Sequence, residues 1–165
     1  MKAHMQTIIN VCFAIFITMY IIQNDKLNEE VEAANIGLIT TLYTDYNTAF
    51  IKNDFPRIAS HFEAPVNFAT NGIIAETEKD VIERYKVMKA TIQEGYAYSV
   101  TGDVTIKRQS DNSYLLCADF TRINKQKEVL FEGRAEYQWI NVADSGWKMN
   151  YLKGIDSGSN SSCLL

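Results

Sequence analysis

The stretch FEGRAEYQW, Phe131–Trp139, alternates strictly between two kinds of residue. Its odd-numbered positions are aromatic or small, and its even-numbered positions are charged or carry an amide. A period of two predicts a β-strand with one face in solvent and the other in the interior. Gly133 and Ala135 interrupt the aromatic face, where a filled core would need side-chain volume. The stretch therefore predicts a strand that lines a cavity.

The segments around this strand predict an α+β fold. Polar breaks, SDN, KQK and ADSG, separate long strand-like segments in the second half of the chain. The expected strands are residues 96–109, 113–124, 128–142 and 147–154. Three helical patterns and the short strand 66–70 precede them, so we expect three N-terminal helices packed into a curved, mostly antiparallel sheet. Gly102 and Gly133 are the expected bends of this sheet.

Each predicted helix has its own start signal. Asn28 is the expected cap of a long first helix that stops at Asn53, and Asp54 can cap a short second one. Thr77 and Asp80 resemble a capping box for the third helix. The first helix carries an apolar stripe at helical spacing. Its members are Ile36, Ile39, Tyr43, Tyr46 and Phe50.

Composition indicates one domain and excludes several functions. The 165 residues are 47% hydrophobic, enough for one core, which we expect over residues 27–156. The net charge of −4 and the lack of a long Lys/Arg cluster argue against nucleic-acid binding. The three cysteines show no paired spacing, so we expect no disulfide framework, and with only two histidines we expect no metal site. No cofactor motif is found.

Both ends of the chain differ in character from the expected domain. Residues 8–22 form an apolar run after Lys2 and His4, which is typical of a signal peptide or a short membrane anchor over residues 1–26. The run is short for a bilayer span of about 20 residues. The expected location is therefore exported, periplasmic or secreted, or membrane-anchored through this segment; an ordinary helix and a cytoplasmic location remain the alternative. The polar tail 157–165 is expected to be disordered.

The order of elements, together with HFEAPVNFATNGIIAETEKDVIERY and the closing GWKMNYLKG, resembles the nuclear transport factor 2-like superfamily and within it the SnoaL-like group. This resemblance covers nearly all of residues 30–155. It implies a cone in which a bent sheet folds around a long helix and leaves a pocket. Homodimers formed through the sheet are common in this superfamily, so the resemblance also implies a homodimer. The same cone carries isomerases, dehydratases, cyclases and non-catalytic binding domains, so the fold alone does not give the function.

The catalytic signatures of these relatives transfer poorly. Ketosteroid isomerases carry a carboxylate base at the end of the strand after the second helix, and residues 66–70 here contain no acid. A dehydratase-like pair of His61 and Asp119 is the remaining candidate, so whether the protein is an enzyme stays open.

The orientation of Asp119 depends on the turn Lys125–Lys127. With a three-residue loop, Asn124 pairs with Glu128 and Asp119 points inward opposite Gly133, which is the register we favour. A loop of two or four residues reverses the parity, so that Phe120 and Arg122 point inward and Asp119 lies outside beside Arg134.

The favoured hypothesis is a binding module that holds a small, mostly apolar molecule. The alternatives are a lyase or isomerase that uses Asp119 as acid or base, and a homodimerising assembly domain without a ligand. The expected ligand-binding residues come from the first helix, the 66–70 strand and the opening strand. They are Tyr43, Tyr46, Asn67, Tyr137 and Trp139.

Overall fold

A computed structural model describes residues 2–156 and Cys163. The chain divides into two compact units, residues 1–38 and residues 39–165. The helices and strands come in separate runs and form an α+β fold, as the sequence predicts. In chain order they are α1 (Lys2–Lys52), α2 (Phe55–Ala59), β1 (Phe62–Phe68), β2 (Ile73–Ala75), α3 (Glu78–Ala90), β3 (Tyr96–Ser110), β4 (Ser113–Asn124), β5 (Val129–Val142) and β6 (Gly146–Asp156).

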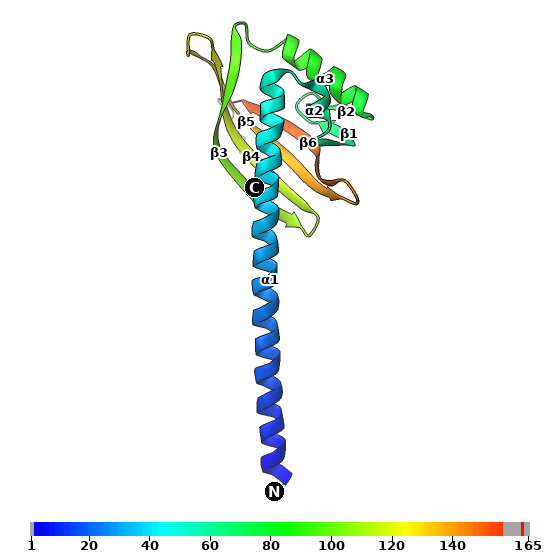
Figure 1. Ribbon diagram of the computed structural model, residues 1–165, viewed down its shortest axis with the longest axis vertical. Coiled ribbons are helices and arrows are strands. Elements are labelled where there is room, and N and C mark those ends of the chain that lie inside the picture. Colours follow the sequence, from blue (N-terminus) through cyan, green and yellow to red (C-terminus); the bar gives the residue numbers. More distant parts are fainter. Residues whose placement is uncertain (1, 157–162, 164–165) are drawn as a thin grey trace. The chain divides into compact units, whose positions relative to one another are not determined.

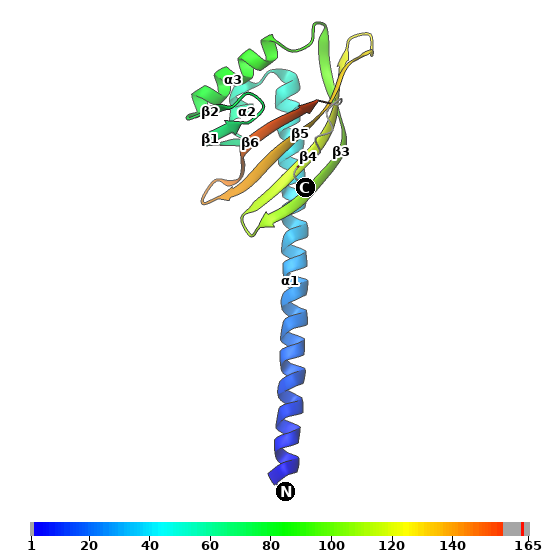
Figure 2. The same cartoon turned by 180° about the vertical axis from the view of Figure 1, so that it is seen from behind.

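The strands form one curved sheet in the order β2-β1-β6-β5-β4-β3. All neighbours pair antiparallel except β1 and β6, which run parallel. The last turns of α1, from Ile39 onward, lie against the concave face of the sheet, in front of it in Figure 1 and behind it in Figure 2. The predicted mostly antiparallel sheet is confirmed, and its four long strands match the expected ranges within about two residues.

The first helix begins far earlier than the sequence analysis predicts. It starts at Lys2, so Asn28 lies inside the helix and does not cap it. The chain has no proline before Pro56 and no glycine before Gly37, and without such a breaker the helical backbone continues through the polar residues. The helix ends at Lys52, and Asn53 takes a positive φ of 57°, which terminates it where the sequence predicts.

Four of the five stripe residues of this helix are buried in the second unit. They are Ile39, Tyr43, Tyr46 and Phe50. No helix in the described part of the chain combines the length and the apolar character that a bilayer crossing requires. The side chains of residues 1–16 lie outside the described structure, so the expected signal or anchor stays a prediction.

The caps of the two shorter helices form as predicted. The Asp54 side chain accepts a hydrogen bond from the Arg57 backbone N–H at the start of α2. At α3, Thr77 Oγ1 accepts from the Asp80 N–H at 3.2 Å, and Asp80 Oδ2 accepts from the Thr77 N–H at 3.0 Å. This reciprocal capping box satisfies two backbone donors that the helix itself leaves unpaired.

Replacing Thr77 with alanine should lower the free energy of unfolding by about 1 kcal/mol, because one backbone donor of the first turn loses its acceptor. Thr77→Ser keeps that acceptor and is the control. Urea denaturation followed by the fluorescence of the buried Trp139 and Trp147 measures the change. Equal midpoints for Thr77→Ala and Thr77→Ser would show that the cap does not stabilise the domain.

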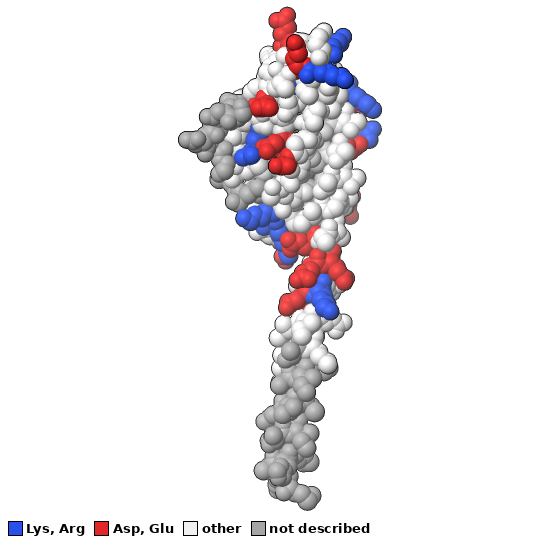
Figure 3. All heavy atoms as spheres, turned by 90° about the vertical axis from the view of Figure 1, so that its left-hand side faces the viewer, with Lys and Arg blue, Asp and Glu red and all other residues white. Residues whose placement is uncertain are grey.

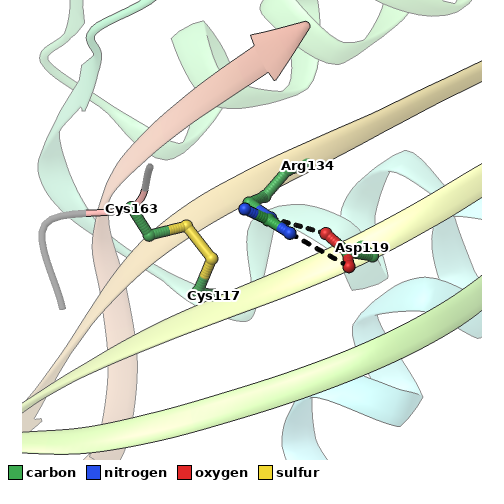
Figure 4. Close-up of a disulfide and its surroundings, with 4 residues drawn as sticks. All are labelled: Cys117, Asp119, Arg134 and Cys163. Carbon is green, nitrogen blue, oxygen red and sulfur yellow. Dashed lines mark hydrogen bonds and ion pairs between the residues drawn. A yellow bond between two sulfur atoms is a disulfide. The ribbon is translucent and has the colours of Figure 1, made fainter. Parts of the chain in front are cut away.

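The expected absence of a disulfide is wrong. Cys117 of β4 is bonded to Cys163 of the tail, with the two Cα atoms 6.2 Å apart (Figure 4). Both cysteines are buried, in a cluster with Ile155. The pairing spans 46 residues, so no short spacing signals it in the sequence. Of the predicted disordered tail, Cys163 is thus held in place, and residues 157–162, 164 and 165 lie outside the described structure.

The outer face of β5 is not simply solvated. The predicted charged row runs from Glu132 to Gln138, yet Glu136 in the middle of it is only 1% exposed. On the face of the molecule shown in Figure 3, acidic and basic side chains lie interspersed in small groups.

Candidate functional site

A cavity of about 320 Å³ lies in the second unit, between α1, α3 and the concave face of the sheet. Aromatic side chains dominate its lining. They are Tyr43, Tyr46, Phe50, Phe68, Phe120 and Tyr137. Ala135, Met88 and Leu152 add further apolar surface, and Asn47, Ser99 and Thr101 add small polar groups. The opening prediction of a hollow beside β5 therefore corresponds to a cavity in the structure.

Buried tyrosines pack together at the wall of this cavity. The hydroxyls of Tyr46 and Tyr85 lie 2.8 Å apart, and the Tyr137 ring packs edge-on against Tyr46 with 5.7 Å between centroids. Burial raises the pKa of Tyr46, Tyr85 and Tyr137 well above the usual value of 10.0. These phenols are consequently neutral at ordinary pH, and they can serve as hydrogen-bonding groups without carrying charge.

The two small residues of the opening strand have different roles. Ala135 borders the cavity, as expected. Gly133 does not, because the space beside it is filled: a Cβ there would lie 2.5 Å from Phe131 Cε1 and 3.0 Å from Phe120 Cζ. The β4–β5 pairing also runs unbroken through Gly133, whereas Gly102 lies at a break in the β3–β4 register between Thr101 and Val104. Gly133 therefore makes room for an aromatic pair, and Gly102 marks the bend.

Asp119 does not point into the cavity. It pairs with Arg134, while Phe120 lies opposite Gly133 and Arg122 opposite Phe131. The favoured three-residue loop does form, since the Asn124 N–H donates to the Glu128 carbonyl at 3.1 Å. The register then shifts between Arg122 and Ile123, where Leu130 is an extra residue in β5. This β-bulge reverses the parity of everything beyond it and gives the alternative arrangement, with Phe120 and Arg122 inward.

The carboxylate of Asp119 forms a two-point ion pair on the outer face. Arg134 donates from Nε to Oδ1 at 2.6 Å and from Nη2 to Oδ2 at 3.2 Å (Figure 4). The hydrogen bond from Arg134 holds the pKa of Asp119 below its usual value. Asp119 is thus a partly exposed, ionised carboxylate on the side of the sheet away from the cavity. Asp119 therefore does not act as an acid or base in the cavity.

His61 is buried, 6% exposed, and does not line the cavity. Its Nε2 lies 2.9 Å from Oδ2 of Asp45, a residue of α1 that also pairs with Arg57. His61 therefore has a carboxylate partner, but this partner is Asp45, not Asp119. The arrangement joins α1 to the start of β1, which is a structural role.

His61 should make stability depend on pH. Burial lowers the pKa of His61 below the usual 6.5, with Asp45 opposing this effect. The unfolded chain then binds the proton more readily than the native one, so the free energy of unfolding should fall as the pH drops below about 6.5. His61→Gln should reduce that fall between pH about 7.5 and 5, measured by urea denaturation at each pH. An identical pH profile for the variant would contradict the assignment.

The remaining predicted residues divide into two groups. Tyr43, Tyr46 and Tyr137 lie in the cavity lining. Asn67 is half-buried in β1, pairs with Tyr151 of β6 and is not part of the lining. Trp139 is fully buried elsewhere in the core, opposite Tyr114 and Met149 in the sheet.

The two charged lining residues, Arg84 of α3 and Arg122 of β4, were not among the predicted site residues. The sequence analysis predicts an inward Arg122 only in the alternative register, in which Phe120 and Arg122 lie on the same face of the strand. Arg84 lies three residues after the buried Val81 on α3, so its place beside the apolar face of that helix could have been read from the spacing.

Comparison with known proteins places this fold in a family. Residues 32–152 match the family described as NTF2-like protein (DUF6841). The chain belongs to this NTF2-like family. The predicted resemblance to the nuclear transport factor 2-like superfamily is thereby confirmed. A comparison with curated proteins gives no match.

Solved structures share the NTF2-like fold at low identity. A cystatin-like domain of unknown function from Nostoc punctiforme is 14% identical with a TM-score of 0.64, over 77% of this chain and 80% of that one. An NTF2-like superfamily protein from Salmonella enterica serovar Typhimurium is 13% identical with a TM-score of 0.60, over 81% and 99%. A protein from Novosphingobium aromaticivorans, described provisionally as a scytalone dehydratase, is 14% identical with a TM-score of 0.60, over 76% and 85%. At these identities the likeness concerns the fold.

Proposed function

We propose that this NTF2-like domain binds a small, mostly apolar molecule in the cavity between α1, α3 and the sheet. The observation that carries the proposal is the cavity of about 320 Å³ with six aromatic side chains in its lining. Binding sites for small molecules are usually preformed hollows of about 300–1,000 Å³, mainly apolar with a few polar groups. A cavity at the lower end of this range fits a ligand of one or two rings, or a short alkyl chain.

The chemistry of the lining favours binding over acid–base catalysis. Among the described lining residues there is no aspartate, glutamate or histidine. The tyrosines are held neutral by burial, and an arginine does not give up its proton in a protein. A general acid or base needs a pKa near the working pH, and no group of the lining meets this condition.

The proposal is tested by filling the cavity. Ala135→Leu adds a branched side chain inside the lining, and saturation-transfer NMR measures binding of one-ring, two-ring and octyl-chain fragments. We expect fragments that bind the wild-type protein to lose at least about tenfold in affinity, because the leucine occupies their volume. The cost in unfolding free energy should stay below the roughly 1–3 kcal/mol of overpacking a filled core.

Ala90→Leu makes the same change on the exposed last turn of α3 and is the control. Equal binding by wild type, Ala135→Leu and Ala90→Leu would show that the fragments bind elsewhere. An absence of any binding fragment would overturn the proposed function.

We also propose that the domain works in an oxidising compartment. The support is the buried disulfide between Cys117 and Cys163, since such bonds form and persist mainly in exported proteins. Cell fractionation of the full chain, with thiol labelling of each fraction, tests this. A protein found in the reducing cytosol with both thiols labelled would contradict it.

A further inference from the structure

The cavity contains positive charge that its lining does not neutralise. Arg84 and Arg122 are the two charged residues of the lining, and neither a carboxylate nor a histidine is found among its described members. A third cation, Lys89, lies beside it and over the ring of the lining residue Phe50. The three side chains are half-buried. A cation that is partly removed from water favours an ionic partner, so this arrangement calls for an anion.

Arg122 reaches the cavity from β4. Its Nη1 donates to Oε1 of Gln93 at 2.8 Å, and its guanidinium lies 5.1 Å and 5.2 Å from the ring centroids of Phe120 and Phe131. Its Nε is shielded from solvent and has no hydrogen-bond partner among the described residues. An amide oxygen and two aromatic faces therefore hold the guanidinium in place, and they leave donor capacity for a ligand.

Lys89 shows the effect of the missing counter-charge. Its Nζ lies 4.3 Å from the centroids of both the Phe50 and Tyr96 rings, shielded from solvent and without a hydrogen-bond partner in the described part of the chain. Burial, and then the positive charge of Arg122, lower the pKa of Lys89 to about 8. The two cations thus repel each other, and an anion between α3 and β4 would relieve this repulsion.

Arg84 supplies the second guanidinium. Its Cζ lies 5.9 Å from the Phe68 ring centroid, and the Asn71 side chain is within hydrogen-bonding distance of its Nη2. Its Nε, like that of Arg122, is shielded and has no partner among the described residues. A guanidinium donates two parallel hydrogen bonds to a carboxylate, which is the geometry that gives arginine its preference for this group.

We infer that the cavity selects molecules in which an apolar body carries a carboxylate, with the Arg122 guanidinium as the principal anchor of that carboxylate. This inference rests on the proposed function, because it names the chemical class of the ligand for the same cavity. The aromatic lining receives the body of the molecule, and the cationic side receives its charge. A planar, singly charged carboxylate fits better than a phosphate, since the lining holds two arginines, its other polar groups are uncharged, and aromatic rings form much of the remaining surface.

Matched acids and amides test the charge requirement on the wild-type protein. The pairs are benzoate and benzamide, cinnamate and cinnamamide, and octanoate and octanamide, with phenyl phosphate as a further probe. Each acid should bind at least about tenfold more tightly than its amide, because a hydrogen bond to a charged group is the stronger one. Equal affinities within the pairs would overturn the inference and leave the proposed function standing. Binding of none of the probes would overturn both, and a preference for phenyl phosphate over benzoate would overturn the choice of carboxylate.

Arg122→Met tests the anchor. It keeps most of the apolar stem and removes the charge, so acid affinity should fall at least about tenfold while amide affinity stays within about twofold. Arg134→Met removes an arginine from the outer face of the same hairpin and should change neither affinity. The unfolding free energy of ligand-free Arg122→Met shows whether the variant is folded. A folded Arg122→Met that binds the acids like the wild type would overturn the role of Arg122.

Discussion

Tyr85→Ala should lower the free energy of unfolding by about 3–5 kcal/mol, which is the usual cost of deleting a buried aromatic side chain. Tyr85 is 0% exposed, and four rings surround it with centroids between 5.7 Å and 6.2 Å away. They belong to Tyr46, Phe50, Phe62 and Phe68. Because these residues come from α1 and β1, Tyr85 joins α3 to the rest of the core, and its loss leaves a cavity bordered by all three elements.

Urea denaturation followed by tryptophan fluorescence measures this loss, and Tyr85→Phe is the matched variant. It keeps the ring and removes only the hydroxyl that pairs with Tyr46 at 2.8 Å, so the cost should be about 1–3 kcal/mol. A loss of less than about 1 kcal/mol for Tyr85→Ala would show that α3 does not pack on the core as described.

Removing the disulfide should have the second large effect. Cys163→Ser should lower the free energy of unfolding by about 2–4 kcal/mol, because the bond closes a long segment and restricts the unfolded chain. The two cysteines are separated by 46 residues, which places the expected effect toward the upper part of that range. Cys12→Ser, at a cysteine outside the pair, is the control and should leave stability unchanged.

Mass spectrometry after alkylation of the denatured protein, without and with prior reduction, counts the thiols of the same samples. We expect one alkylated cysteine in the denatured, unreduced wild-type protein and three after reduction. Full alkylation without reduction, together with equal stability of Cys163→Ser and wild type, would contradict the bond between β4 and the tail.

Local signals in the sequence predict most of the elements. The cap at Asp54, the capping box of Thr77 and Asp80, and the left-handed stop at Asn53 act over a few residues and hold in the structure. The strands follow from alternation between polar breaks, and their order identifies the fold. The start of α1 is the exception, since Asn28 carries a capping side chain but the chain around it has no breaker that would end the helix before it.

The site depends on features that no local signal determines. One extra residue, Leu130, turns Asp119 outward and Arg122 inward, although the turn itself forms as predicted. His61 pairs with the carboxylate of Asp45 on α1, and Cys117 is bonded to Cys163 in the tail. Both pairings result from tertiary packing. The predicted hollow corresponds to a cavity because Ala135 lies on the inner face of β5 both in the sequence prediction and in the structure. The space beside Gly133 is instead occupied by the Phe131 side chain.

The most direct test of the account is to locate a bound probe by NMR. With methyl-labelled protein and cinnamate, intermolecular NOEs should connect the probe to the methyl groups of Ala135, Met88 and Leu152, which border the cavity from β5, α3 and β6. The same probe should show no NOE to Val104 on the exposed part of β3. NOEs confined to Val104 and other exposed residues, with none to the three cavity methyls, would contradict a ligand site inside the cone.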